Sequence, residues 1–344
     1  MQFKINMVKL PTPTNKRLRQ SNIEALRILA MLMILVLHTR VNGVDTVSDG
    51  IDDTNKFMSF LFEAVSIVGV NLFILISGYF GIHLKRRSVA NLLFQIYFFG
   101  LVGLIGWVAL QGTFAVDIRY YIKAIFPVSQ TIWFIPNYVM LMLLSPILNA
   151  FCEKYNIKQI AKLTLAVYAL SYFWSAIIQG TISGFGGYSW GWFLLLYLTG
   201  RILREYTDNH TYKKRYFLLG YIFLTIAIVF IAFVQNYIPI GKSLLWNYDS
   251  PLVYLSSICL FLCFVKMEIG YVKWINWLAS SSFAVLLLHV SPFAQYDKVN
   301  QYLYDNYSGV VYIILTGIII IAYYMVAVLL DQPRLYMSSK IFKK

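Results

Sequence analysis

Charged residues are scarce in this chain of 344 residues, where they make up 13% against 59% hydrophobic residues. A soluble domain carries about 25% charged residues. The mean hydropathy of +0.65 is also far above that of a water-exposed domain. The length alone would allow two or three soluble domains, but the composition excludes them and predicts an integral membrane protein.

Cysteine is rare as well. Cys152, Cys259 and Cys263 fall within or at the ends of apolar segments without paired spacing, so we expect neither a disulfide framework nor a metal site. No internal repeat and no low-complexity linker divides the chain. We expect one membrane domain over residues 21–335, with a basic N-terminal tail (1–20) and a basic C-terminal tail (336–344).

Long apolar runs, by contrast, recur along almost the whole chain. A transmembrane helix needs about 20 apolar residues, and runs of that kind predict an all-α, polytopic protein with about ten transmembrane helices. The expected spans are 22–43, 57–80, 90–112, 132–152, 161–180, 188–204, 216–235, 250–267, 274–294 and 310–330.

Acidic residues are outnumbered, with 15 Asp and Glu against 29 Lys and Arg, for a net charge of +14. Such an excess can indicate a nucleic-acid partner. If the N-terminus is cytoplasmic, however, most of the basic residues fall in loops on the cytoplasmic side, as the positive-inside rule requires. The charge therefore predicts orientation, with both termini in the cytoplasm, membrane lipids as partners and no nucleic acid.

Two ionisable residues lie on one face of the first span. An ionisable group at the centre of a span costs about 2.5 to 3.5 kcal/mol, so each one marks a candidate functional site. Arg27 and His38 are eleven residues apart. In a helix this spacing places both side chains on nearly the same face, separated by about 16 Å along the axis. Arg27 is expected near the cytoplasmic surface and His38 in the outer half of the membrane. The structural alternatives are a snorkelling anchor and a helix-packing hydrogen bond.

Other spans carry polar residues at the depth of His38. Glu63, Trp133, Asn137 and His289 are all expected in the outer third, so a shared pocket is a hypothesis based on depth. Interhelical hydrogen bonds for Glu63 and Asn137, and an aromatic belt for Trp133, are the structural alternatives.

A basic run, Lys85-Arg86-Arg87, follows the inner end of the second span. Such a run is usually a topology signal. It would also suit phosphate groups, because arginine pairs with phosphate through two parallel hydrogen bonds.

These residues stand in motifs that resemble membrane-bound acyltransferase family 3, the multi-span O-acyltransferases of bacterial surface glycans. Arg27, ten intervening residues and His38 match its marker. The run from Asn71 to Ser77-Gly78-Tyr79, the segment from Trp133-Phe134 to Leu144-Ser145-Pro146, and the stretch from Asn276 to His289 are similar to later motifs in the same order. The resemblance covers roughly residues 21–335. The family's Arg-x-x-Arg is replaced here by the consecutive Lys85-Arg86-Arg87.

The resemblance implies a bacterial plasma-membrane enzyme that uses acetyl-CoA as donor substrate, with no tightly bound cofactor, and a glycan or lipid-linked oligosaccharide as acceptor. Arg27, with Lys85, Arg86 or Arg87, would bind the donor phosphates. His38 would act as general base or, alternatively, carry the acyl group, with Glu63 or His289 orienting its ring. A flippase or exporter of a lipid-linked glycan is the rival function, with His38 and Glu63 as a proton relay.

Overall fold

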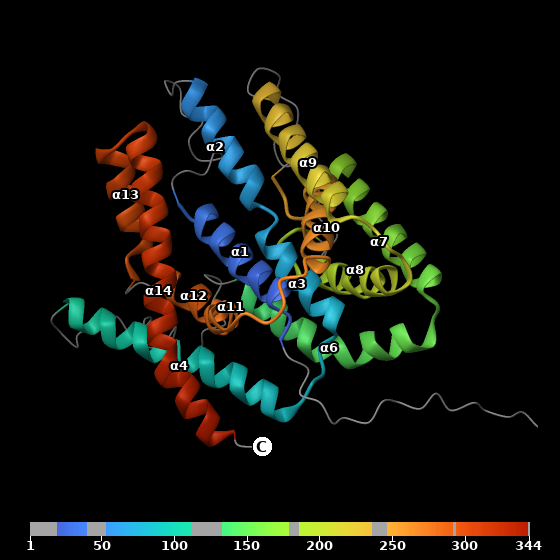
Figure 1. Cartoon of the computed structure of the whole chain (residues 1–344), viewed down its shortest axis with the longest axis horizontal. Coiled ribbons are helices and arrows are strands. Elements are labelled where there is room, and N and C mark those ends of the chain that lie inside the picture. The colour runs from blue at the N-terminus through green and yellow to red at the C-terminus, as the bar shows by residue number, and fades with distance from the viewer. Residues whose placement is uncertain are drawn as a thin grey trace, which may run out of the picture.

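The computed structural model describes residues 19–39, 53–111, 133–178, 186–235, 246–291 and 294–342. Every regular element within these ranges is a helix (Figure 1). The all-α prediction is therefore confirmed.

The helices follow the expected spans along most of the chain. They are α1 (Ser21–Leu37), α2 (Asp53–Ser66), α3 (Gly69–Phe80), α4 (Arg86–Gln111), α6 (Phe134–Lys154), α7 (Ile157–Ile178), α8 (Trp190–Asn209), α9 (Lys214–Gln235), α10 (Pro251–Val265), α11 (Lys273–Ala279), α12 (Ser282–His289), α13 (Tyr296–Asn306) and α14 (Gly309–Ile341).

Five segments of the described chain are long and apolar enough to cross a membrane. They are Phe60–Phe80, Arg86–Leu110, Phe134–Lys154, Lys214–Val234 and Gly309–Ile341, and the shorter Pro251–Val265 is apolar too. A protein with several membrane-spanning helices is thereby supported. The number ten and the cytoplasmic position of both termini stay predictions.

Two of the expected spans are broken rather than continuous. The span over 57–80 divides into α2 and α3 at residues 67–68, and the span over 274–294 divides into α11 and α12 at residues 280–281. At the second break Ser280 donates its hydroxyl hydrogen to the Trp277 carbonyl oxygen at 2.6 Å. A serine hydroxyl that bonds a nearby carbonyl oxygen competes with the backbone hydrogen bonds of the helix, and this explains the break.

The last helix extends past the expected end of its span at residue 330. Asp331 and Arg334 are both buried in α14 and joined by two hydrogen bonds, Nε to Oδ1 at 2.6 Å and a terminal nitrogen to Oδ2 at 2.9 Å. The two charges neutralise each other inside the bundle, and the helix continues beyond them to Ile341. Residues 336–341 of the expected tail are thus helical.

Helix α1 lies at the centre of the fold, where it packs against α2, α3, α10, α11, α12 and α14 (Figure 1). Helix α3, which contacts α1, also packs closely on α8. A Cβ atom at Gly78 would overlap the Tyr197 carbonyl oxygen, and one at Gly200 would lie 2.6 Å from the Leu75 carbonyl oxygen. Small residues allow this close approach of helices. The helix that carries Arg27 and His38 thus lies at the centre of the bundle.

Candidate functional site

A polar cavity of about 420 Å³ lies at the C-terminal end of α1. It brings together three residues singled out from the sequence, His38, Glu63 and Trp133. Its other polar and aromatic lining residues are Thr39, Tyr188, Trp246, Tyr248, Asp297 and Asn300. We call this space the outer cavity.

His38 caps α1 and exposes its ring to the outer cavity. Its Nδ1 lies 2.8 Å from the Ile34 carbonyl oxygen. A carbonyl oxygen only accepts hydrogen bonds, so Nδ1 carries the hydrogen and Nε2 of the neutral ring keeps its lone pair. The ring is therefore held in the tautomer that accepts a proton at Nε2.

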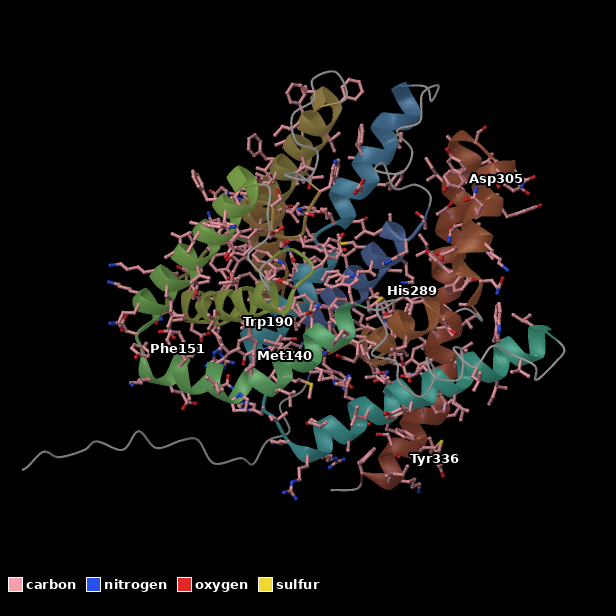
Figure 2. The ribbon with its side chains drawn as sticks, turned by 180° about the vertical axis from the view of Figure 1, so that it is seen from behind. Met140, Phe151, Trp190, His289, Asp305 and Tyr336 are labelled. Carbon is pink, nitrogen blue, oxygen red and sulfur yellow. The ribbon has the colours of Figure 1, made fainter. Side chains whose placement is uncertain are left out.

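His289 packs directly on His38, with 4.9 Å between the ring centroids and 59° between the ring planes. It is 5% exposed, and Figure 2 shows it in the interior between the ribbons. Its Nδ1 lies 3.1 Å from the Val285 carbonyl oxygen, and its Nε2 has no hydrogen-bond partner among the described residues. His38 and His289 thus lie next to each other, and the contact between them is made by their rings.

Helix α13 holds this pair from the far side. The Tyr296 ring lies 5.8 Å from that of His289, and its hydroxyl donates to the Leu35 carbonyl oxygen at 2.9 Å. Burial raises the pKa of Tyr296 above its usual range, so the hydroxyl keeps the hydrogen that it donates. The same helix contributes Asp297 and Asn300 to the outer cavity.

Aromatic rings form one wall of the outer cavity around Trp133. Its ring centroid lies 4.8 Å from that of Tyr188 and 5.5 Å from that of Tyr248. Asn137 supports this wall, since its Nδ2 donates to the carbonyl oxygens of Trp133 at 2.8 Å and Tyr188 at 3.0 Å. The bond to Tyr188 joins two separate segments, which resembles the structural alternative expected for Asn137.

Asn71 fixes the same wall from α3. Its Nδ2 donates to the Tyr248 carbonyl oxygen at 2.8 Å and to Ser257 Oγ at 3.1 Å, while its Oδ1 accepts from Trp192 Nε1 at 3.0 Å. The side chain is fully buried. Because its hydrogen-bonding groups are paired across three segments, Asn71 is a structural residue of the site.

Arg27 lines a second cavity of about 500 Å³, which we call the inner cavity. Its guanidinium lies 3.7 Å from Glu24 Oε1, and the Arg27 side chain is 37% exposed. Phe134 lines this cavity, whereas its neighbour Trp133 lines the outer one, so the start of α6 contributes to both. Arg27 and His38 therefore face two different cavities along one helix.

The inner cavity has a polar side built from α3, α4 and the linker between them, with Ser77, His83, Ser88, Asn91 and Gln95. The linker is pinned at Ile82, whose N–H donates to the Tyr197 hydroxyl at 3.0 Å and whose carbonyl oxygen accepts from Asn149 Nδ2 at 2.8 Å. These two bonds place His83 at the cavity.

The basic run lies beside this cavity rather than in its lining. Lys85, Arg86 and Arg87 are exposed at the start of α4, and Ser88 is the next residue, which does line the cavity. Their role in binding phosphate stays a prediction.

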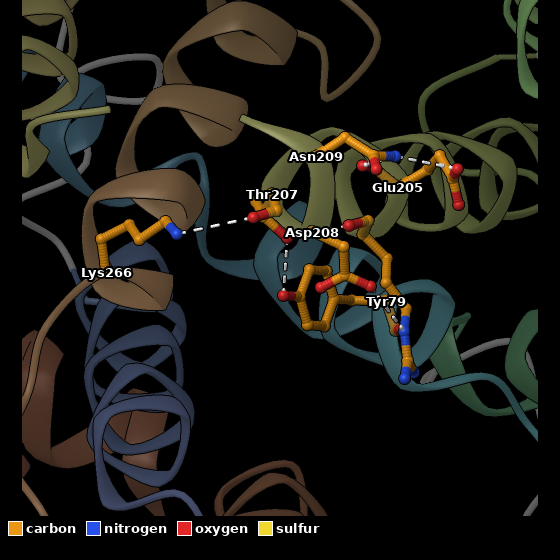
Figure 3. A network of polar contacts seen from close by, with 7 residues as sticks. Tyr79, Glu205, Thr207, Asp208, Asn209 and Lys266 are labelled. Carbon is orange, nitrogen blue, oxygen red and sulfur yellow. Dashed lines mark hydrogen bonds and ion pairs between the residues drawn. The ribbon is translucent and has the colours of Figure 1, made fainter. Parts of the chain in front are cut away.

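A network of polar contacts locks the end of α3, where the linker to the inner cavity begins (Figure 3). The Tyr79 hydroxyl lies 2.8 Å from Thr207 Oγ1, and Arg204 donates to the Tyr79 carbonyl oxygen at 3.3 Å. Lys266 reaches the Thr207 carbonyl oxygen at 3.5 Å. The ends of α3, α8 and α10 are thereby joined.

Sequence reasoning missed several residues of both cavities. Gln95 carried a visible signal, because it is a lone polar residue inside an otherwise apolar run. Asp297 and Asn300 gave none, since α13 lies in a segment expected to be a loop. In the part of the chain that the structure describes, no group of three His, Cys, Asp or Glu residues is placed to hold a metal ion.

The fold and these two cavities define a helical membrane protein with a polar site along one central helix. The family model for the acyltransferase domain of acyltransferase family 3 matches residues 20–330, which is nearly the whole chain. The chain belongs to this family and is a membrane acyltransferase. No curated protein and no solved structure matches it.

Proposed function

We propose that this protein is an O-acetyltransferase that moves an acetyl group from acetyl-CoA to a sugar hydroxyl of a bacterial surface polysaccharide or its lipid-linked precursor. The single observation that carries this proposal is His38, with Nε2 available as a base in a cavity lined by aromatic rings and carboxylates. Such a lining suits a sugar, whose ring faces stack and whose hydroxyls donate hydrogen bonds.

His38 acts as general base in the proposed reaction. Its Nε2 takes the proton of the acceptor hydroxyl while that oxygen forms a bond to the thioester carbonyl carbon. The carbon–sulfur bond then breaks, and the leaving thiolate takes the proton back from His38. A general base in this position contributes about 10²- to 10⁴-fold to the rate.

Arg27 binds the donor phosphates at the inner cavity, assisted by Lys85, Arg86 or Arg87. The rise of about 16 Å between Arg27 and His38 is comparable with the length of the pantetheine arm. The thioester then lies near the start of α6, beside His38, while the nucleotide stays at the cytoplasmic side. Glu63 lines the same cavity as His38 and is assigned to orienting the acceptor or the ring.

The test is acetyl transfer by the purified protein in detergent, supplied with labelled acetyl-CoA and host oligosaccharide. We expect His38→Ala to abolish transfer because the base is lost, and Arg27→Ala to raise the KM for acetyl-CoA at least tenfold because the phosphates lose their partner. Lys158→Ala, an exposed change in the first turn of α7, is the control and should leave both unchanged.

Retained transfer by His38→Ala would remove the general base from the mechanism. Unchanged donor binding by Arg27→Ala would remove Arg27 from the donor site. If the wild-type protein consumes no acetyl-CoA but moves a lipid-linked glycan across vesicles, the transport function replaces this proposal.

A further inference from the structure

Gln95 has a buried amide nitrogen, Nε2, with no partner among the described residues. It lies in α4, is 7% exposed and lines the inner cavity. A buried donor without a partner costs about 1 to 3 kcal/mol, and most such groups in native proteins are paired. The donor therefore points to a ligand that the cavity receives.

Gln95 belongs to a polar row on one face of α4. Ser88, Asn91 and Gln95 follow at spacings of three and four residues, which places them on the same face of a helix, and all three line the inner cavity. Asn91 Oδ1 accepts from Ser338 Oγ at 2.5 Å. This bond turns the Asn91 oxygen toward α14. The row extends about 10 Å along the helix.

We propose that Gln95 and Asn91 bind the two amides in the pantetheine arm of the donor. This inference rests on the proposed function and deepens it. The two pantetheine amides are separated by a β-alanine unit, and Asn91 and Gln95 are separated by one helical turn, a rise of about 6 Å. An amide carbonyl on the arm accepts the hydrogen that Gln95 Nε2 leaves unpaired.

The order of the contacts follows from the direction of α4. The helix begins at the basic run, and Gln95 lies further along it than Asn91. Gln95 is therefore assigned to the cysteamine amide, which is nearer the thioester, and Asn91 to the amide nearer the phosphate. Arg27 in the same cavity faces the phosphate end.

This arrangement selects against acyl donors that lack amides, such as acyl phosphates and acyl lipids. When such a substrate is bound, the Gln95 amide hydrogen stays buried without an acceptor. A site built to bond a polar group therefore binds this substrate weakly. CoA and an acyl carrier protein both present the same arm, so both are sources of the proposed donor.

The test compares Gln95→Met, which keeps the volume and removes the donor, with the wild type. Transfer is measured from acetyl-CoA, S-acetyl-N-acetylcysteamine, which keeps only the amide nearer the thioester, and an amide-free alkyl thioacetate. We expect the KM for the first two donors to rise about threefold to tenfold. We expect no KM rise for the amide-free donor, because it makes no bond to Gln95 that the substitution could remove, and a nearly constant kcat throughout.

Thr164→Val is the matched control, because Thr164 is similarly buried and its Oγ1 has no partner in the described part of the chain, but it lines neither cavity. It should leave all three KM values unchanged. A KM rise in Gln95→Met that is the same for all three donors would assign Gln95 a structural role and overturn the inference. Gln95→Asn serves as a second variant if Gln95→Met does not fold.

Calorimetric binding of CoA and of pantetheine separates this inference from the proposed function. A wild type that binds both ligands but transfers nothing contradicts the proposed function alone. Binding of pantetheine to Gln95→Met with wild-type affinity contradicts the inference alone. Acetylated acyl carrier protein, tested beside acetyl-CoA, identifies the source, because the preferred donor has the higher kcat/KM.

Discussion

His38 and His289 form the same hydrogen bond within their helices. In each residue Nδ1 donates to the carbonyl oxygen four residues earlier, that of Ile34 for His38 and that of Val285 for His289. Both rings then have an Nε2 lone pair when neutral. His38 faces the cavity, whereas His289 is buried against it. If His38 takes up a proton as proposed, the adjacent His289 ring is a polarisable neighbour whose Nε2 has no partner among the described residues. We therefore predict that His289 positions the base.

We expect His289→Phe to lower kcat about tenfold while the KM for acetyl-CoA stays unchanged. The phenylalanine ring fills the same space but accepts no hydrogen bond, so the loss concerns proton transfer and not packing. His289→Gln, which keeps an acceptor, should recover part of the rate. The pH profile of kcat should shift in His289→Phe; an unaltered profile and rate would give His289 a packing role only.

At the scale of the helix, α14 shows how charged side chains are accommodated in the interior of this fold. Asp331 and Arg334 are one turn apart, and their side chains are 0% and 3% exposed. Removing one partner of a buried pair leaves an uncompensated charge, which costs about 3 to 5 kcal/mol, whereas replacing both with apolar residues is often neutral. The same helix reaches the polar row of α4 through Ser338 and Asn91.

Arg334→Leu should therefore destabilise the protein, and the double variant Asp331→Leu with Arg334→Leu should recover most of the loss. Thermal unfolding in detergent measures both. Lys340→Leu, an exposed position on the same helix, is the control and should change little. A double variant as unstable as the single one would mean that the pair bonds a further group.

At the scale of the whole molecule, the basic residues predict that both termini lie in the cytoplasm. The two cavities then have distinct surroundings, with Arg27 toward the cytoplasm, where acyl-CoA is made, and His38 toward the outside. Helix α1 connects the two along its length. Orientation therefore decides from which side each substrate approaches.

Reporter fusions to the C-terminus test this orientation. A green fluorescent protein fused after Lys344 should fluoresce, because it folds in the cytoplasm, and an alkaline phosphatase at the same place should be inactive. Fusions in the loop between α8 and α9, another expected cytoplasmic segment, are the matched internal control. Active phosphatase at the C-terminus would reverse the predicted topology or change the number of spans.

The sequence predicted part of the site because ionisable residues in apolar spans are conspicuous. Arg27, His38, Glu63 and His289 were found in this way, and His38, Glu63 and Trp133 do share a cavity. Asn137 was expected in the pocket but supports its wall from behind, since depth along a span does not define the direction of a side chain. The break at Ser280 is explained by local hydrogen bonding that a hydropathy average does not register.

By itself the sequence determined the membrane class, the helical fold, most helix positions and the family, because hydropathy, charge and motif spacing are local properties of the chain. Only the tertiary structure decided which polar residues meet. The contact of His38 with His289, the contribution of α13 to the outer cavity and the row of Asn91 and Gln95 in the inner one depend on packing between distant helices. Such packing is set by many side chains at once, and no single segment encodes it.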